Sequence, residues 1–300
     1  MQPALAVMPQ SPRTALPPGA CDTHTHVFGP FDQYPLSCPP DYPLPLAPAA
    51  HHRRMLDAVG LDRCVLVQPT PNDTDHSALI NAMSLASGRL RAVGAARAAI
   101  ADDRLEALHL AGVRGLRFVD APSPQGTARP GAIGTEEIPL LAARIKELGW
   151  YAHVWARLPR LVERLPELLR SQVPIVVEHM AMLDAAKGLR DADFQYVLGL
   201  LREGRIWMKL SVCRCSQAAP HYSDLREFHD ALVQANPDRL LWGSDWPFIR
   251  MEGREPDVGA LLDLLREWLA DTALEQKILV TNPARVFGFD EAAPPARQSG

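Results

Sequence analysis

The chain has few cysteines, and they form no recognisable framework. Five are spread over 300 residues, an odd number, and none has the spacing of a zinc finger. A secreted scaffold held by disulfides would carry an even, closely spaced set. We therefore expect free thiols and a reducing compartment, and we assign the protein to the cytoplasm.

Strong charge and long apolar runs are also missing. The formal net charge is −4 without any block of like charge, which disfavours nucleic acid or an anionic membrane surface as a partner. No run is long enough to span a bilayer, and residues 1–19 lack the basic and apolar regions of a signal peptide. No Gly-x-Gly-x-x-Gly or phosphate-loop motif stands at a strand-to-helix junction, so we expect no nucleotide. These absences favour a small-molecule substrate and leave the oligomeric state open.

The sequence does contain a repeated alternation of short apolar runs and longer helical patterns. Residues 63–67 and 173–177 are apolar almost throughout, which is typical of strands covered on both faces. The runs end near eight positions: Val27, Gln68, Arg97, Val119, Trp155, Glu178, Ser211 and Ser244. Eight βα units predict an α/β fold, a (β/α)8 TIM barrel with parallel strands. We expect one domain over residues 20–289, with loose tails at 1–19 and 290–300.

Polar residues gather at the ends of these runs, where such barrels hold their chemistry. His24 and His26 are two residues apart near the end of the first run, so both rings project from one face of a strand. The other candidates come from later runs: Arg117, His153, His179, Arg214 and Asp245. Seven such residues at the same end of separate strands predict an active site.

Three motifs resemble the amidohydrolase superfamily: Asp-Thr-His-Thr-His at 22–26, Val-Glu-His-Met at 177–180 and Trp-Gly-Ser-Asp-Trp-Pro at 242–247. Four others resemble its branch that contains 2-pyrone-4,6-dicarboxylate lactonase: residues 25–30, 115–118, 211–214 and 280–283. The resemblance extends from about residue 20 to residue 288. It implies a barrel enzyme that hydrolyses a cyclic ester.

The resemblance also implies roles for the catalytic candidates. His24, His26 and His179 would surround the scissile carbonyl, and Asp245 would take a proton from the attacking water. These roles suit the chemistry, because attack on a lactone builds negative charge on an oxygen that needs donors, and water needs a nearby base. The expected reaction is the opening of a lactone by water.

Substrate contacts follow from the same resemblance. Arg117 and Arg214 would bind the substrate, and Tyr42 and Thr70 stand where the branch has further polar contacts. One departure concerns Met182, which occupies the position of an arginine in the pyrone dicarboxylate lactonase. We therefore expect fewer cationic anchors, and a lactone with one carboxylate or a sugar-acid lactone as substrate. The sequence alone does not place Arg129.

Metal binding is the second point of departure. Many amidohydrolases bridge two metals with a lysine where this chain has Arg117, whose fixed positive charge disfavours such a centre. No metal is favoured, and His153 is then expected to contact the substrate. The alternative is one zinc on His24, His26, His153 and Asp245, as in a decarboxylase or hydratase. A barrel that binds a metabolite without catalysis is the third hypothesis.

Two other segments carry expectations of their own. Residues 35–48 are rich in proline and follow the first run, so they are a candidate lid, with Tyr42 facing the substrate. Residues 51–54, His-His-Arg-Arg, open a helical pattern and are expected to form a solvated face.

Overall fold

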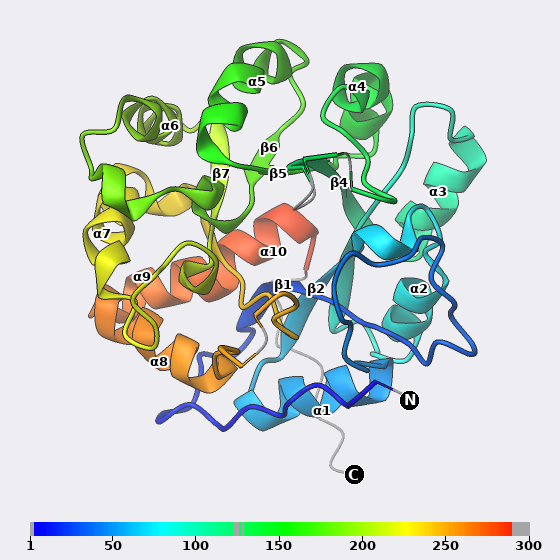
Figure 1. The fold of residues 1–300 in the computed structure, drawn as a ribbon, viewed down its shortest axis with the longest axis horizontal. Helices are drawn as coiled ribbons and strands as arrows, with labels where there is room; N and C mark the ends of the chain where they lie inside the picture. The colour runs from blue at the N-terminus through cyan, green and yellow to red at the C-terminus, as the bar shows by residue number, and fades with distance from the viewer. Residues whose placement is uncertain (1–2, 123–125, 128, 252, 290–300) are drawn as a thin grey trace.

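The structure is a computed structural model that describes residues 3–122, 126–127, 129–251 and 253–289. Eight parallel strands follow one another around a barrel in sequence order (Figure 1). They are β1 (Cys21–Thr25), β2 (Arg63–Val67), β3 (Leu90–Gly94), β4 (Val113–Asp120), β5 (Tyr151–Ala156), β6 (Ile175–Val177), β7 (Ile206–Leu210) and β8 (Leu240–Trp242). The expected (β/α)8 barrel is confirmed. Each expected strand end lies within three residues of the observed one, the largest difference being between Arg97 and Gly94.

The last strand meets the first through the residues that follow β8. The backbone of His26 donates to Trp246 O over 2.9 Å, and the backbone of Asp245 donates to His24 O over 2.8 Å. Thr25 and Trp246 form a parallel bridge. These bonds bring the β1 and β8 motifs together at one point of the barrel wall.

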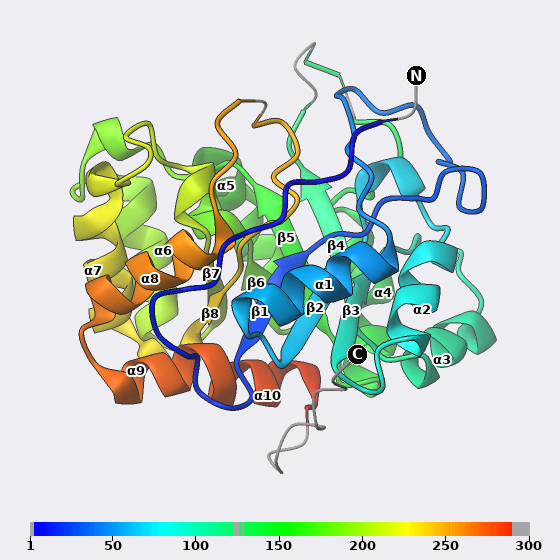
Figure 2. The same ribbon diagram turned by 90° about the horizontal axis from the view of Figure 1, so that it is seen from below.

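Helices surround the strands: α1 (Ala49–Val59), α2 (Ser77–Ser84), α3 (Asp102–Leu110), α4 (Glu137–Glu147), α5 (Leu158–Arg170), α6 (Ala192–Arg202), α7 (Arg226–Ala235) and α8 (Val258–Leu269). Their apolar stripes face the sheet, as Leu161, Leu165 and Leu168 of α5 show by their complete burial. Short helices α9 (Thr272–Gln276) and α10 (Asn282–Phe287) lie at one end of the barrel, opposite the long loops (Figure 2). The carboxyl ends of the strands face those loops.

The segment before β1 is packed against the barrel, whereas the sequence predicts a loose tail. Leu5 forms a parallel bridge with Leu46. The backbone of Gln10 donates to Asp257, and Arg266 of α8 donates to Thr14 O over 2.6 Å. Backbone hydrogen bonds of this kind are invisible to composition, which is why a proline-rich segment appears unstructured in sequence. Residues 290–300, the other expected tail, lie outside the described residues.

The expectation of a solvated face at residues 51–54 is wrong for its two histidines. His51 and His52 are buried. His51 Nε2 lies 2.7 Å from Ala6 O, and His52 Nε2 lies 2.8 Å from Thr25 Oγ1. The histidines therefore fasten α1 to the first segment and to β1, and only the arginines face solvent.

All five cysteines are free thiols. Within the described ranges, no helix combines the length and the apolar character that a membrane span needs.

Candidate active site

The two histidines of β1 point at one carboxylate. His24 Nε2 lies 3.4 Å and His26 Nε2 3.1 Å from Asp245 Oδ1. The buried Asp22 joins β1 to the segment after β8. Its Oδ1 accepts from the backbone N–H of His24 and from that of Ser244, both over 3.0 Å. The predicted pairing of His24, His26 and Asp245 is thus present in the structure.

His179 is presented by a turn with unusual backbone angles. Each of the residues His179–Met182, which form η2, has a positive φ between 47° and 58°. Each such residue costs roughly 1–2 kcal/mol, and strain of this kind is concentrated at functional sites. The turn brings the ring of His179 to 4.5 Å from that of His24, and its Nε2 to 3.8 Å from Asp245 Oδ2. Burial lowers the pKa of His179 to about 4, so the ring is neutral at pH 7.

Asp245 is held by an arginine from the neighbouring strand end. Arg214 Nε donates to Asp245 Oδ2, and its Nη1 donates to Ile249 O over 2.7 Å. Its buried Nη2 has no hydrogen-bond partner among the described residues. Burial alone would raise the pKa of Asp245, but the charge of Arg214, with smaller contributions from His179 and His26, holds that pKa well below its usual range. Asp245 is therefore ionised, and Arg214 keeps one donor free.

Beneath the histidines is a group of buried charges of which the sequence analysis named Arg117 as a site residue but not its partners. We call Arg117, Glu178 and Lys209 the buried floor. Arg117 Nε donates to Glu178 Oε2 over 3.1 Å, and Lys209 Nζ lies 3.6 Å from Glu178 Oε1. Lys209 Nζ also lies 3.2 Å from His24 Nδ1. A lysine inside the apolar run of β7 is the sequence signal that could have revealed this group.

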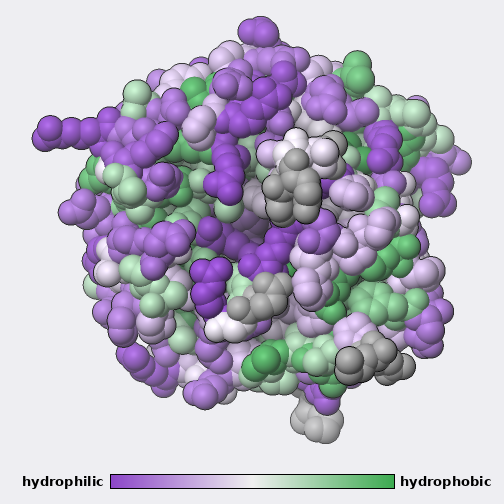
Figure 3. Space-filling model, in the orientation of Figure 1, coloured by the Kyte–Doolittle hydropathy of each residue, from purple (hydrophilic) through white to green (hydrophobic). Residues whose placement is uncertain are grey.

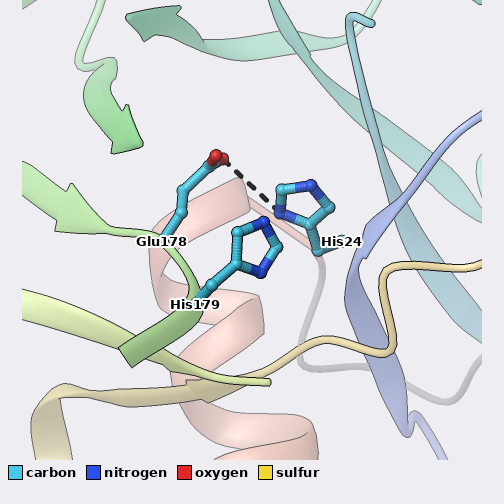
Figure 4. A group of neighbouring side chains, drawn as sticks. All are labelled: His24, Glu178 and His179. Atoms are coloured by element: carbon cyan, nitrogen blue, oxygen red, sulfur yellow. Dashed lines mark ion pairs between the residues drawn. The ribbon is translucent and has the colours of Figure 1, made fainter. Parts of the chain in front are cut away.

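The two cations of the buried floor share one carboxylate. Burial lowers the pKa of Lys209 to about 8, so its amine is still an ammonium at pH 7. Burial would raise the pKa of Glu178, but Arg117 and Lys209 lower it further than burial raises it. His24, by contrast, is neutral, because burial and the nearby charge of Lys209 lower its pKa. Figure 4 shows its ring beside that of His179 and joined to the carboxylate of Glu178 by the marked contact.

A cavity of about 260 Å³ opens above these groups. This volume suits a compact ring and not a long chain. Figure 3 shows a hydrophilic hollow near the centre of the loop-bearing face. Seven predicted site residues line the cavity: His26, Tyr42, Thr70, Arg117, His179, Arg214 and Asp245. His24 lies directly behind this lining, in contact with Asp245.

Four further arginines, which we call the arginine rim, line the mouth of the same cavity: Arg129, Arg157, Arg250 and Arg254. Asp41 joins two of them, since its carboxylate accepts from Arg129 Nη1 over 2.9 Å and from Arg250 Nη2 over 2.6 Å. Arg250 also stacks on Tyr42, 4.2 Å from the ring centre. The expected shortage of cationic anchors is therefore wrong. Met182 does line the cavity, but loops elsewhere supply the positive charge.

His153 lies apart from the other predicted residues. Its ring stacks on Phe287 of α10, with 5.7 Å between centroids, at the end of the barrel opposite the loops. It is fully buried and does not line the cavity. Burial lowers its pKa, and neither ring nitrogen has a hydrogen-bond partner among the described residues. The structure does not bring His153 to the substrate side of the site.

Among the residues that the structure describes, two groups of side chains are close enough to hold a metal ion: His24, His26 and Asp245, and His24, Glu178 and His179. The first lacks His153, so the predicted four-residue zinc set is not assembled. The chain's own cations already occupy both groups, since Lys209 lies beside His24 and Glu178, and Arg214 donates to Asp245. Such a charge distribution does not suit a divalent ion.

A larger cavity of about 680 Å³ lies beside the site, lined by residues 3–9, 43–45, 246–251 and 255–257. None of these described residues is a histidine. Since it lacks the histidines, we assign the chemistry to the smaller cavity.

The sequence is similar to those of known proteins over most of its length. The family described as Amidohydrolase matches residues 21–289. A 4-sulfomuconolactone hydrolase of Rhizobium radiobacter is 35% identical over 278 residues, which cover 91% of each chain. A 2-pyrone-4,6-dicarboxylate hydrolase of Comamonas testosteroni is 33% identical over 299 residues, 94% of each chain. A solved structure from Acinetobacter baumannii, described as a "probable 2-pyrone-4,6-dicarboxylic acid hydrolase" with citric acid bound, is 25% identical with a TM-score of 0.77, covering 90% of this chain and 100% of that one.

Proposed function

This chain belongs to the amidohydrolase family and acts on a cyclic ester, and we propose that its substrate is a lactone carrying two acidic groups. One observation supports the proposal above the others. Six arginines line a single small cavity whose only described acidic lining residue is Asp245: Arg117, Arg129, Arg157, Arg214, Arg250 and Arg254. Positive charge in that excess favours a dianion over a neutral sugar lactone.

Asp41 illustrates how the arginine rim holds an acidic group. Its two carboxylate oxygens are shared between Arg129 and Arg250. An acidic group of the substrate would compete for these two guanidinium groups, and each charge-assisted hydrogen bond contributes about 1.5–3 kcal/mol. The second acidic group would bind Arg214 through its free Nη2. The names of the relatives include a dicarboxylate and a sulfonated lactone, which agrees with two anionic anchors.

The reaction uses Asp245 as the general base. The oxygen of a water molecule bonds to the lactone carbonyl carbon while Asp245 takes a proton from that water. The carbonyl oxygen becomes an oxyanion beside the donors of His24 and His179. The ring C–O bond then breaks, and the leaving oxygen takes the proton from Asp245. One hydroxy acid is formed, and the carboxylate is restored.

Arg214 links substrate binding to the strength of this base. While the guanidinium of Arg214 donates to Asp245, the pKa of Asp245 is low and the carboxylate is a weak base. A substrate acid that draws on the Nη2 of Arg214 shares that charge and raises the pKa of Asp245. The base therefore strengthens when an acidic substrate is bound.

Neither alternative is supported as well. A zinc-dependent decarboxylase or hydratase needed His153 as a ligand, and His153 stacks on Phe287 away from the cavity. A barrel that only binds a metabolite has no use for a water-activating carboxylate among three histidines. No step of the proposed reaction uses a metal ion.

A substrate panel tests the proposal. Protein dialysed against a chelator is assayed with lactones that carry two acidic groups, one acidic group or none. We expect the doubly acidic lactones to have the highest kcat/KM, and their KM to rise with salt because the attraction is screened. A neutral sugar lactone as the best substrate would contradict the assignment.

The matched variant is Asp245→Asn, which keeps the size of the side chain and removes the base. Turnover should fall by at least about a hundredfold while the protein stays folded, because a positioned base contributes at least that factor. Activity within a few-fold of the parent would remove Asp245 from the reaction.

A further inference from the structure

Lys209 has no role in the steps described so far, yet it contacts the centre of the site. Its side chain is completely buried within β7. Its Nζ lies 3.2 Å from His24 Nδ1 and 3.6 Å from Glu178 Oε1. Burying a lysine is costly unless it is paired, so a buried lysine beside a catalytic ring requires an explanation.

The chemistry of an ammonium restricts the ring that it contacts. A lysine ammonium has three donors and no acceptor. His24 Nδ1 must therefore accept, and in a neutral imidazole the proton then resides on Nε2. That Nε2 is buried, has no hydrogen-bond partner among the described residues, and lies 3.4 Å from Asp245 Oδ1. Its N–H thus faces the carboxylate of Asp245 without a hydrogen bond to it, at the place where the reaction forms an oxyanion.

We propose that Lys209 is a positioning residue that fixes His24 as the Nε2–H tautomer, so that His24 donates to the lactone carbonyl and cannot bind a metal through that nitrogen. The proposal rests on the lactone hydrolysis proposed above for the identity of the acceptor. The assignment of the tautomer itself depends only on Lys209 and His24.

His26 provides a contrast within the same motif. Its Nδ1 lies 2.7 Å from Val67 O, and a carbonyl can only accept, so His26 Nδ1 carries a proton. Its Nε2 lies 3.1 Å from Asp245 Oδ1 and is the nitrogen that would face an ion held by that carboxylate, as in histidines that bind metals. His24, two residues earlier, is held in the opposite sense by Lys209. The pair therefore does not offer two metal-binding nitrogens.

Glu178 defines the competing arrangement. Its Oε1 lies 3.4 Å from His24 Nδ1, the contact marked in Figure 4. If His24 Nδ1 carried the proton and donated to Glu178, its Nε2 would have a free lone pair for a metal ion. Lys209 and Glu178 thus compete for one nitrogen, and the outcome decides whether His24 is a donor or a ligand.

Nuclear magnetic resonance of the parent protein, labelled with 15N-histidine and measured at pH 7, distinguishes the two tautomers. Correlations between ring nitrogens and carbon-bound protons show which nitrogen carries the proton, and a His24→Gln sample assigns the His24 signals. We expect a protonated Nε2 and an unprotonated Nδ1. A protonated Nδ1 would overturn the proposal, whatever lactone the protein hydrolyses.

Lys209→Met then tests the consequence, with Lys277→Met as the matched control at a partly exposed lysine on the chain's surface. In Lys209→Met, His24 should change to the Nδ1–H tautomer, and kcat should fall about tenfold to a hundredfold with KM within about threefold, as for a lost transition-state donor. Zinc should bind at least about tenfold more tightly than to the parent, because the restraint on the ligand is removed. The control should match the parent in all three measurements.

Other outcomes would refute the role of Lys209. An unchanged His24 tautomer in folded Lys209→Met would mean that another group sets the proton. A parent that binds one zinc per chain through His24 would exclude the Nε2–H form. Because the tautomer and the zinc affinity are measured without substrate, failure of this proposal is distinguishable from failure of the lactonase assignment.

Discussion

The buried floor and the arginine rim both place charged side chains at one cavity, but the floor is built from strands and strand ends and the rim from loops. Arg117, Glu178 and Lys209 project from strand ends or strands, and Glu178 and Lys209 have no exposed side-chain surface. Arg250 of the rim comes from the loop after β8, and 24% of its side chain is exposed. The floor sets two cations against one buried carboxylate, whereas the rim sets four arginines against Asp41 and so has the larger excess of positive charge. We infer that charge held by strands is a condition of folding and of His24 geometry, and that charge held by loops selects the substrate.

The largest difference should appear when a carboxylate is neutralised in each region. Glu178→Gln leaves Arg117 and Lys209 buried without their counter-charge, which should lower the free energy of unfolding by about 3–5 kcal/mol. Asp41→Asn in the rim should lower it by less, because Asp41 and Arg250 keep 16% and 24% of their side-chain surface in contact with water. Urea unfolding of both variants measures the two values. Equal losses would show that the floor and the rim do not differ in the way proposed.

The second largest effect should be a loss of stability in acid, and it should come from a buried histidine, His52. Burial lowers the pKa of His52 to about 3, below the ordinary value of about 6.5. Its contribution to stability is therefore present above pH 6.5 and is lost as the pH falls toward 3, roughly 3 kcal/mol by pH 4. His52→Gln should reduce the loss of unfolding free energy between pH 7 and pH 4 by that amount.

Arg250→Met is the comparison for that measurement, because arginine does not titrate in this range. Its unfolding free energy should fall between pH 7 and pH 4 as steeply as that of the parent. An identical pH slope for His52→Gln and the parent would show that His52 is not held neutral.

The same division explains what could be predicted from the sequence. The barrel was predictable because apolar runs covered on both faces have a definite length and spacing, and His24, His26, His179 and Asp245 follow directly from the strand ends. Lys209 was missed. A lysine in the apolar run of β7 does indicate a buried charge, but its partners, His24 at 3.2 Å and Glu178 at 3.6 Å, are known only once the barrel brings them together. The arginine rim was missed for another reason. The positions of Arg250 and Asp41 depend on the paths of two loops, and loop sequences have no periodicity that fixes a path.

Removing one guanidinium of the rim should affect binding and little else. Arg250→Met should raise KM for a doubly acidic lactone about tenfold, the value of roughly one charge-assisted hydrogen bond, with kcat within about threefold. Its effect on KM should shrink at high salt, since screening weakens the same attraction in the parent. Arg53→Met, on the exposed face of α1, is the control and should change neither constant. A loss confined to kcat would place Arg250 among the groups that act in the transition state.

The smallest effect is expected at His153, which is buried and polar but belongs to neither region. A substrate contact would lose about tenfold in rate on His153→Gln, and a zinc ligand would lose metal and nearly all activity together. Because His153 stacks on Phe287 below the cavity, we expect kcat within about threefold of the parent and no change in metal content. Steady-state kinetics and elemental analysis of parent and variant measure both quantities. A tenfold or greater loss of kcat in folded His153→Gln would contradict this expectation. It would show that a residue below the buried floor, next to α10, supports the reaction as well as the fold.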